Sequence, residues 1–170
     1  MHETDLILGV AGLPPQSARN CRQELSPIPN GEFKKSLNGD LLFLASNERR
    51  RYRSVISCSD TNVPTIEGIW IGSQINVGCI QYLWQTVNAG ERRVRLIRPA
   101  VDGSVCPINE VGDTVRFTMV DDGVVALSFP HEERVFVGFR PWLTMLVTNF
   151  IFETNEWGLS GSWKLFLEEI

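Results

Sequence analysis

Glycine and proline interrupt this chain at short intervals along its whole length, with 14 glycines and 9 prolines among 170 residues. Between them lie runs of about five to ten residues rich in Val, Ile, Leu, Phe and Thr. Short runs with regular turn signals are typical of antiparallel β-sandwiches and β-barrels. No amphipathic pattern extends beyond about two helical turns. We therefore predict an all-β fold, a sandwich or barrel of about eleven short strands with at most one short helix.

Two tight hairpins are indicated by turns that contain glycine. Asn-Gly and Asp-Gly turns tolerate the positive φ angles that a short β-hairpin connection needs. The first turn, residues 38–40, separates the runs 33–37 and 41–44, and the second, residues 121–123, separates the runs 114–120 and 124–129.

The two last strands, residues 142–153 and 159–170, predict a long hairpin that ends the chain. In the first of them strict alternation places Leu143, Met145 and Val147 on one side and Leu146, Phe150 and Phe152 on the other. In the second, one side carries Leu159, Gly161, Trp163, Leu165 and Leu167, and the other carries Ser160, Ser162, Lys164, Phe166 and Glu168. Apolar residues on both sides of a strand predict that both faces are covered.

The remaining runs fit a single β domain over residues 1–170, with a small lobe or extended loop at residues 90–107. Pro64 and Gly68 suit the two ends of one helical turn. The other predicted strands are residues 6–10, 21–28, 52–58, 74–83 and 134–139.

The charge balance and hydropathy favour a soluble chain that folds in the cytoplasm. The formal net charge is −4, the pI is about 5.2 and 43% of the residues are hydrophobic, so nucleic acid is not an expected partner. The apolar run 6–10 is too short for a signal peptide. Residues 142–152 include Thr144, Thr148 and Asn149 and fall short of the roughly 20 residues that span a bilayer, so no membrane contact is expected.

No set of residues predicts catalysis, a cofactor or a metal site. The chain has only two histidines, His2 at the N-terminus and His131 in a loop, and it lacks nucleophile-elbow and phosphate-loop motifs. The acidic pairs 121–122, 132–133 and 168–169 are interpreted mainly as solvated turn residues. We therefore do not expect an enzyme.

Four cysteines, Cys21, Cys58, Cys79 and Cys106, are too widely spaced for a close metal-binding pair. Reduced, buried thiols are the expectation, with a disulfide between Cys58 and Cys79 as the alternative. The basic stretches 49–53 and 92–98 are interpreted as solvated segments, with an acid-seeking patch at 49–53 as the alternative.

Six segments carry a resemblance to a known family: RPWLTMLVT (140–148), FETNEWG (152–158), WKLFLEEI (163–170), SLNGDL (36–41), YRSVISCSD (52–60) and GIWIG (68–72). They resemble segments of structural proteins from the tail-tip region of long-tailed bacteriophages. The resemblance covers about half of the chain and implies a role in the distal tail, tail tip or baseplate. It implies a β-sandwich or β-barrel that forms a trimeric or hexameric ring in the virion, assembled in the bacterial cytoplasm. The partners that it implies are other tail proteins, such as the tail tube, hub and tail-tip proteins.

In a ring, a neighbouring chain can pair with an unpaired strand edge and bury an apolar patch. The aromatic residues near the C-terminus are therefore the predicted interface of such a subunit. A β-sandwich module that binds cell-surface carbohydrate through exposed tryptophans is the alternative. The predicted interface residues are Trp142, Phe150, Phe152, Trp157, Trp163 and Phe166.

Overall fold

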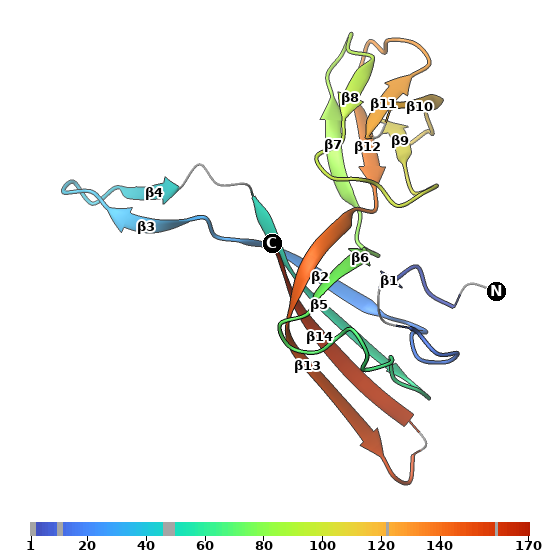
Figure 1. Ribbon diagram of the computed structural model, residues 1–170. Helices are drawn as coiled ribbons and strands as arrows, with labels where there is room; N and C mark the ends of the chain where they lie inside the picture. Colours follow the sequence, from blue (N-terminus) through green and yellow to red (C-terminus); the bar gives the residue numbers. More distant parts are fainter. Residues whose placement is uncertain (1–2, 10–11, 46–49, 122, 159) are drawn as a thin grey trace.

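The computed structural model describes residues 3–9, 12–45, 50–121, 123–158 and 160–170 (Figure 1). Every regular element in these ranges is a β-strand, which confirms the predicted all-β class. No helix in the described ranges is long and apolar enough to cross a membrane. The helical turn predicted between Pro64 and Gly68 is wrong. Residues 64–65 have no regular structure, and the Ile69 N–H donates to the Ile66 carbonyl in a single turn that contains Gly68.

A six-stranded antiparallel sheet forms the body of the molecule. One face of this sheet packs against the loops at residues 12–20 and 61–73, which contribute the buried side chains of Ala18 and Ile69. The Trp163 Nε1–H donates a hydrogen bond of 2.8 Å to the Ser17 carbonyl and fastens the first of these loops to the sheet. In spatial order the strands are β1 (Ile7–Leu8), β6 (Gln74–Gly78), β13 (Trp142–Asn155), β14 (Ser160–Glu169), β5 (Arg51–Asp60) and β2 (Arg22–Ile28).

The predicted C-terminal hairpin is β13 paired with β14, but its side-chain pattern differs from strict alternation. A bulge shifts the register between Val147 and Asn149. One extra residue reverses the facing of everything after it, because side chains alternate with a period of two. Phe150 and Phe152 therefore face Leu165 and Trp163 on the core side, together with Val147, and the predicted opposite placement is wrong.

A second group of strands has its own core and extends from β7 to β12, well beyond the predicted lobe at residues 90–107. Two three-stranded sheets enclose Val87, Val125, Val137 and Phe139. The predicted strand 74–83 is divided, since it ends at Gly78 and a new strand of the second group starts at Leu83. The sheets are β10 (Phe117–Asp121), β11 (Val124–Leu127) and β8 (Arg93–Arg95), and β7 (Leu83–Val87), β12 (Val135–Phe139) and β9 (Cys106–Asn109).

A buried ion pair connects this lobe to the six-stranded sheet. Arg98 follows β8, and its Nε lies 2.7 Å from the Oε1 of Glu169 at the end of β14. The other Glu169 oxygen accepts the Tyr52 N–H at 3.0 Å, and the Arg98 guanidinium also donates to the Arg50 carbonyl at 2.6 Å. Arg98 therefore ties the lobe to the last strand and to the start of β5.

The remaining pair, β3 (Gly31–Lys35) and β4 (Leu41–Ala45), forms the first predicted hairpin and belongs to no larger sheet. Gly39 in its turn has a φ of 87°, as the Asn-Gly signal requires. The hairpin leaves the body between β2 and β5 and projects far from both lobes (Figure 1). We call residues 31–45 the arm.

Candidate functional site: an exposed apolar arm and its root

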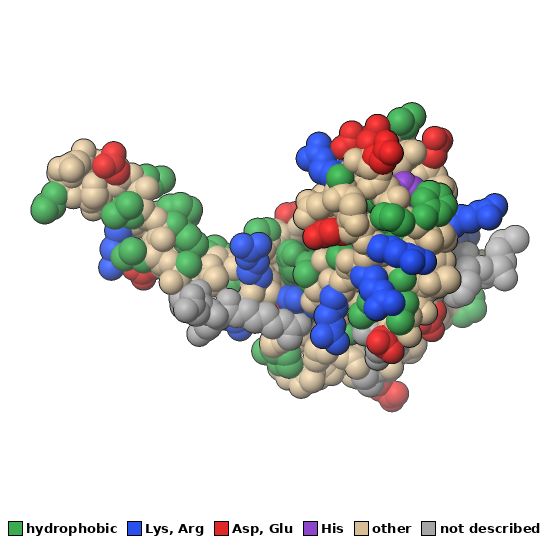
Figure 2. Space-filling model, turned by 90° about the horizontal axis from the view of Figure 1, so that it is seen from above, with side chains coloured by type: hydrophobic (Ala, Val, Ile, Leu, Met, Phe, Trp, Pro, Cys, Tyr) green, Lys and Arg blue, Asp and Glu red, His purple; other side chains and the backbone are tan. Residues whose placement is uncertain are grey.

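The arm carries large apolar side chains on both of its faces. Phe33 and Phe43 face each other across the two strands, with ring centroids 4.8 Å apart, and Phe33 is 68% exposed. Leu42 and Leu44 point to the opposite face. Figure 2 shows hydrophobic side chains along the arm, which stands clear of the body. The exposed apolar residues of the arm are Phe33, Leu37, Leu41, Leu42, Phe43 and Leu44.

An isolated two-stranded hairpin is marginally stable in water, and monomeric proteins rarely expose a contiguous apolar patch of this kind. No described residue outside the arm forms a strand beside β3 or β4. Both outer edges of the arm and both of its faces are therefore open to another chain.

A mostly apolar pocket of about 490 Å³ lies where the arm joins the body. The aromatic rings of the arm form one side, and the end of β2 with Tyr52 forms the other. Arg50 and Arg51 lie in the lining and place positive charge at this otherwise apolar site. We call this the root pocket. Its lining residues are Pro27, Ile28, Pro29, Asn30, Phe33, Phe43, Arg50, Arg51 and Tyr52.

The six predicted interface residues divide into three groups. Trp157 is 91% exposed in the turn between β13 and β14, and Phe152 is 50% exposed on β13. Trp142, Phe150 and Phe166 are half-buried, and Phe150 packs against the core. Trp163 is only 1% exposed and lies inside the core, because its face of β14 is covered by the loop that contains Ser17. Trp163 is thus not available to another chain, and the structure brings only Phe150 and Phe152 together, with ring centroids 5.7 Å apart.

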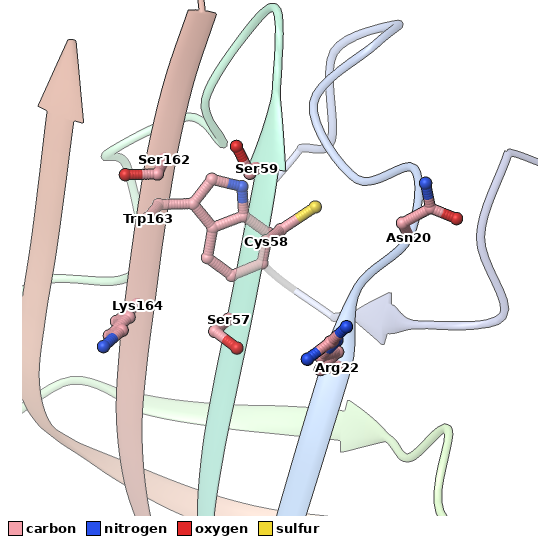
Figure 3. A pocket seen from close by; sticks show the side chains of 8 residues that line it. All are labelled: Asn20, Arg22, Ser57, Cys58, Ser59, Ser162, Trp163 and Lys164. Carbon is pink, nitrogen blue, oxygen red and sulfur yellow. The ribbon is translucent and has the colours of Figure 1, made fainter.

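A second, shallow pocket lies over the ends of β2, β5 and β14 (Figure 3). Strand register places Arg22, Ser57 and Lys164 in one row across the three strands. Two cations and several hydroxyls suit weak anion contacts, but the lining contains no carboxylate or imidazole that would act as a base. The lining residues are Asn20, Arg22, Ser57, Cys58, Ser59, Ser162, Trp163 and Lys164.

All four cysteines are free thiols, as expected, and the alternative Cys58–Cys79 disulfide is absent, but only Cys58 and Cys79 are buried. Burial raises the pKa of Cys79 to about 11 and raises the pKa of Cys21 and Cys58 as well. A thiol with a raised pKa is protonated near neutral pH and is a poor nucleophile. The Cys58 Sγ donates to the Arg19 carbonyl at 3.0 Å, which is a structural contact.

Other chemically interesting side chains have structural partners. In the part of the chain that the structure describes, no three His, Cys, Asp or Glu side chains come together as metal ligands. His131 lies in a loop with its ring 4.8 Å from that of Phe129. Glu168 and Glu169 lie in β14, not in a turn, and each pairs with an arginine, Arg53 and Arg98 respectively. Asp122 and Arg49 lie outside the described residues.

No protein family model matches this chain, and no curated protein matches it.

The sequence does not predict the root pocket. The pocket forms between segments about 20 residues apart, and their approach depends on the path of the arm. One signal was available. Residues 41–44 read LLFL without polar alternation, and a strand that is apolar on both faces needs cover on both faces.

Proposed function

We propose that the chain is a non-enzymatic structural subunit of a bacteriophage tail tip or baseplate, which assembles as a ring in the virion and contacts neighbouring tail proteins. The arm is the observation that carries this proposal. Its apolar faces and open strand edges are poorly suited to a free monomer and well suited to burial against another chain. The resemblance of about half of the sequence to tail-tip proteins supports the same function.

The physical argument rests on apolar area. Burying a Phe or Leu side chain stabilises an association by about 1.5–3 kcal/mol, and six such side chains are exposed on the arm. Association also costs translational and conformational freedom, so only part of this gain becomes affinity. The arm therefore offers a large apolar contribution to such an interface.

Deletion of the arm tests the proposal. We expect that replacing Gly31–Ala45 by a Gly-Gly linker leaves the body folded, because the arm belongs to neither core, and that the shortened chain is absent from purified particles. Incorporation can be measured by immunoblotting of particles from a phage that supplies the variant. A Trp84→Ala variant is the matched control, since Trp84 is an exposed aromatic residue on the lobe. Normal incorporation without the arm would contradict the proposal.

Carbohydrate recognition is the second candidate, favoured by an exposed aromatic pair on the lobe. The rings of Tyr82 and Trp84 are 6.3 Å apart, and both side chains are exposed. Aromatic faces of this kind suit stacking with a sugar ring. Binding to a glycan array that is lost in Trp84→Ala but kept without the arm would favour this candidate over the tail subunit.

A further inference from the structure

The turn between β13 and β14 presents one tryptophan to solvent. The Asn155 Oδ1 accepts the Trp157 N–H at 3.1 Å and the Gly158 N–H at 3.3 Å, and these bonds close the backbone of the turn. Trp157 itself is 91% exposed. A large aromatic side chain presented to solvent on a hydrogen-bonded turn has the form of an interface anchor, because tryptophan is enriched among the residues that carry most of the binding energy.

The root pocket can accommodate this side chain and matches it in chemistry. Its volume of about 490 Å³ is more than an indole needs, and its lining includes the aromatic residues Phe33, Phe43 and Tyr52. Aromatic rings in such a pocket offer both apolar contact and edge-to-face packing.

The charges around the two features are opposite in sign. Glu153 and Glu156 are exposed beside Trp157, and no ion pair involves either carboxylate in the described chain. Arg50 and Arg51 lie in the lining of the root pocket. Complementary potentials of this kind fix the orientation of an encounter and disfavour wrong partners.

One chain cannot make this contact with itself. The root pocket includes Arg51 at the start of β5, whereas the turn lies near Asp60 at the end of β5, through the pairing of Asp60 with Gly161. Nine residues of strand separate the two positions by about 30 Å. The arm and the tip of the β13–β14 hairpin also point away from each other (Figure 1). Trp157 can therefore enter only the root pocket of another molecule.

We infer that Trp157 of one copy of this chain inserts into the root pocket of a second copy, with Glu156 directed toward Arg50 and Arg51. The inference rests on the proposed function, because it specifies how the subunits of the ring meet. Each copy has one Trp157 and one pocket, so the contact is head-to-tail. Head-to-tail contacts close into rings when the rotation between copies allows it.

Sedimentation velocity with the full chain and three variants tests this contact. We expect the wild type to be oligomeric and Trp157→Ala to be a monomer, with a dissociation constant raised at least about 30-fold. We expect Phe43→Asp to be a monomer as well, since it places a negative charge where Glu156 must approach. Trp70→Ala, at another exposed tryptophan, is the control and should keep the wild-type mass.

A mixing experiment makes the test specific for the head-to-tail contact. Trp157→Ala keeps an intact pocket and Phe43→Asp keeps an intact Trp157, so an equimolar mixture should form one junction and sediment as a two-chain complex. Circular dichroism of each variant checks folding. A wild-type monomer, an oligomeric Trp157→Ala variant, or a mixture that stays monomeric would each overturn the inference. Because particle incorporation is tested separately by deleting the arm, the subunit function can survive a failure of this contact.

Discussion

The buried carboxylate of Asp60 connects the loop before β2 to the end of β5. Its oxygens accept hydrogen bonds from the Arg19 side chain, at 2.6 Å from Nη2, and from the backbone N–H groups of Arg19 and Thr61. These bonds outweigh the cost of burying the charge and lower the pKa of Asp60 to about 2. The same loop supplies the Ser17 carbonyl that binds Trp163, so Asp60 helps to keep that tryptophan covered.

The lowered pKa of Asp60 predicts a pH-dependent stability. A carboxyl group whose pKa is lower in the folded state stabilises the fold fully above its unfolded value of 3.8, and this contribution is lost as the pH falls toward 2. We expect Asp60→Asn to lower the free energy of unfolding by about 2 kcal/mol near pH 7. The difference from wild type should narrow between about pH 5 and about pH 2.

Urea unfolding at a series of pH values measures this effect. Glu132→Gln is the matched control, because Glu132 is exposed and the structure gives it no partner among the described residues. A difference between wild type and Asp60→Asn that stays constant with pH would contradict the assigned role of Asp60.

At the scale of elements, the sequence predicts hairpins well and their side-chain facing less well. Both glycine turns are found where local turn chemistry places them, because Gly39 and Gly123 each supply the positive φ that a tight connection needs. The C-terminal hairpin is also found at the predicted place. The bulge after Val147 has no local signal. It depends on how β13 pairs with β14 and β6, so the facing of Phe150 and Phe152 was predicted wrongly.

The candidate site was predictable only in part, for a related reason. Exposure of Trp157 follows from its position in a turn, which the sequence shows. The burial of Trp163 depends on a loop almost 150 residues away in sequence, and the root pocket depends on the approach of the arm to β2. Long-range contacts of this kind leave no periodic pattern in the sequence.

The Arg98–Glu169 ion pair joins two elements and should contribute far more to stability than a surface pair. Both side chains are buried, so Arg98→Met leaves a carboxylate without its partner and should lower the free energy of unfolding by about 3–5 kcal/mol. Replacing both residues, in Arg98→Met with Glu169→Leu, should recover part of this loss. Arg53→Met, which breaks the exposed pair with Glu168, should cost at most about 1 kcal/mol. Equal losses for the Arg98 and Arg53 variants in chemical denaturation would contradict this interpretation.

At the scale of the whole molecule, two features extend from two separate cores. Most buried apolar residues lie in these cores, while the arm and the β13–β14 tip are exposed. Such a shape suits a subunit that contacts other chains through the arm and the tip. The long separation between the arm and the β13–β14 tip favours contacts with two different neighbours, as a ring requires.

A cryo-electron microscopy map of the phage tail tip tests the central claim, that this chain is a ring subunit held by its arm, most directly. We expect density for several copies of the chain around the tail axis, with the arm of each copy buried against a neighbouring chain. A tail tip that lacks the chain, or copies whose arms extend into solvent without contact, would contradict the proposed function.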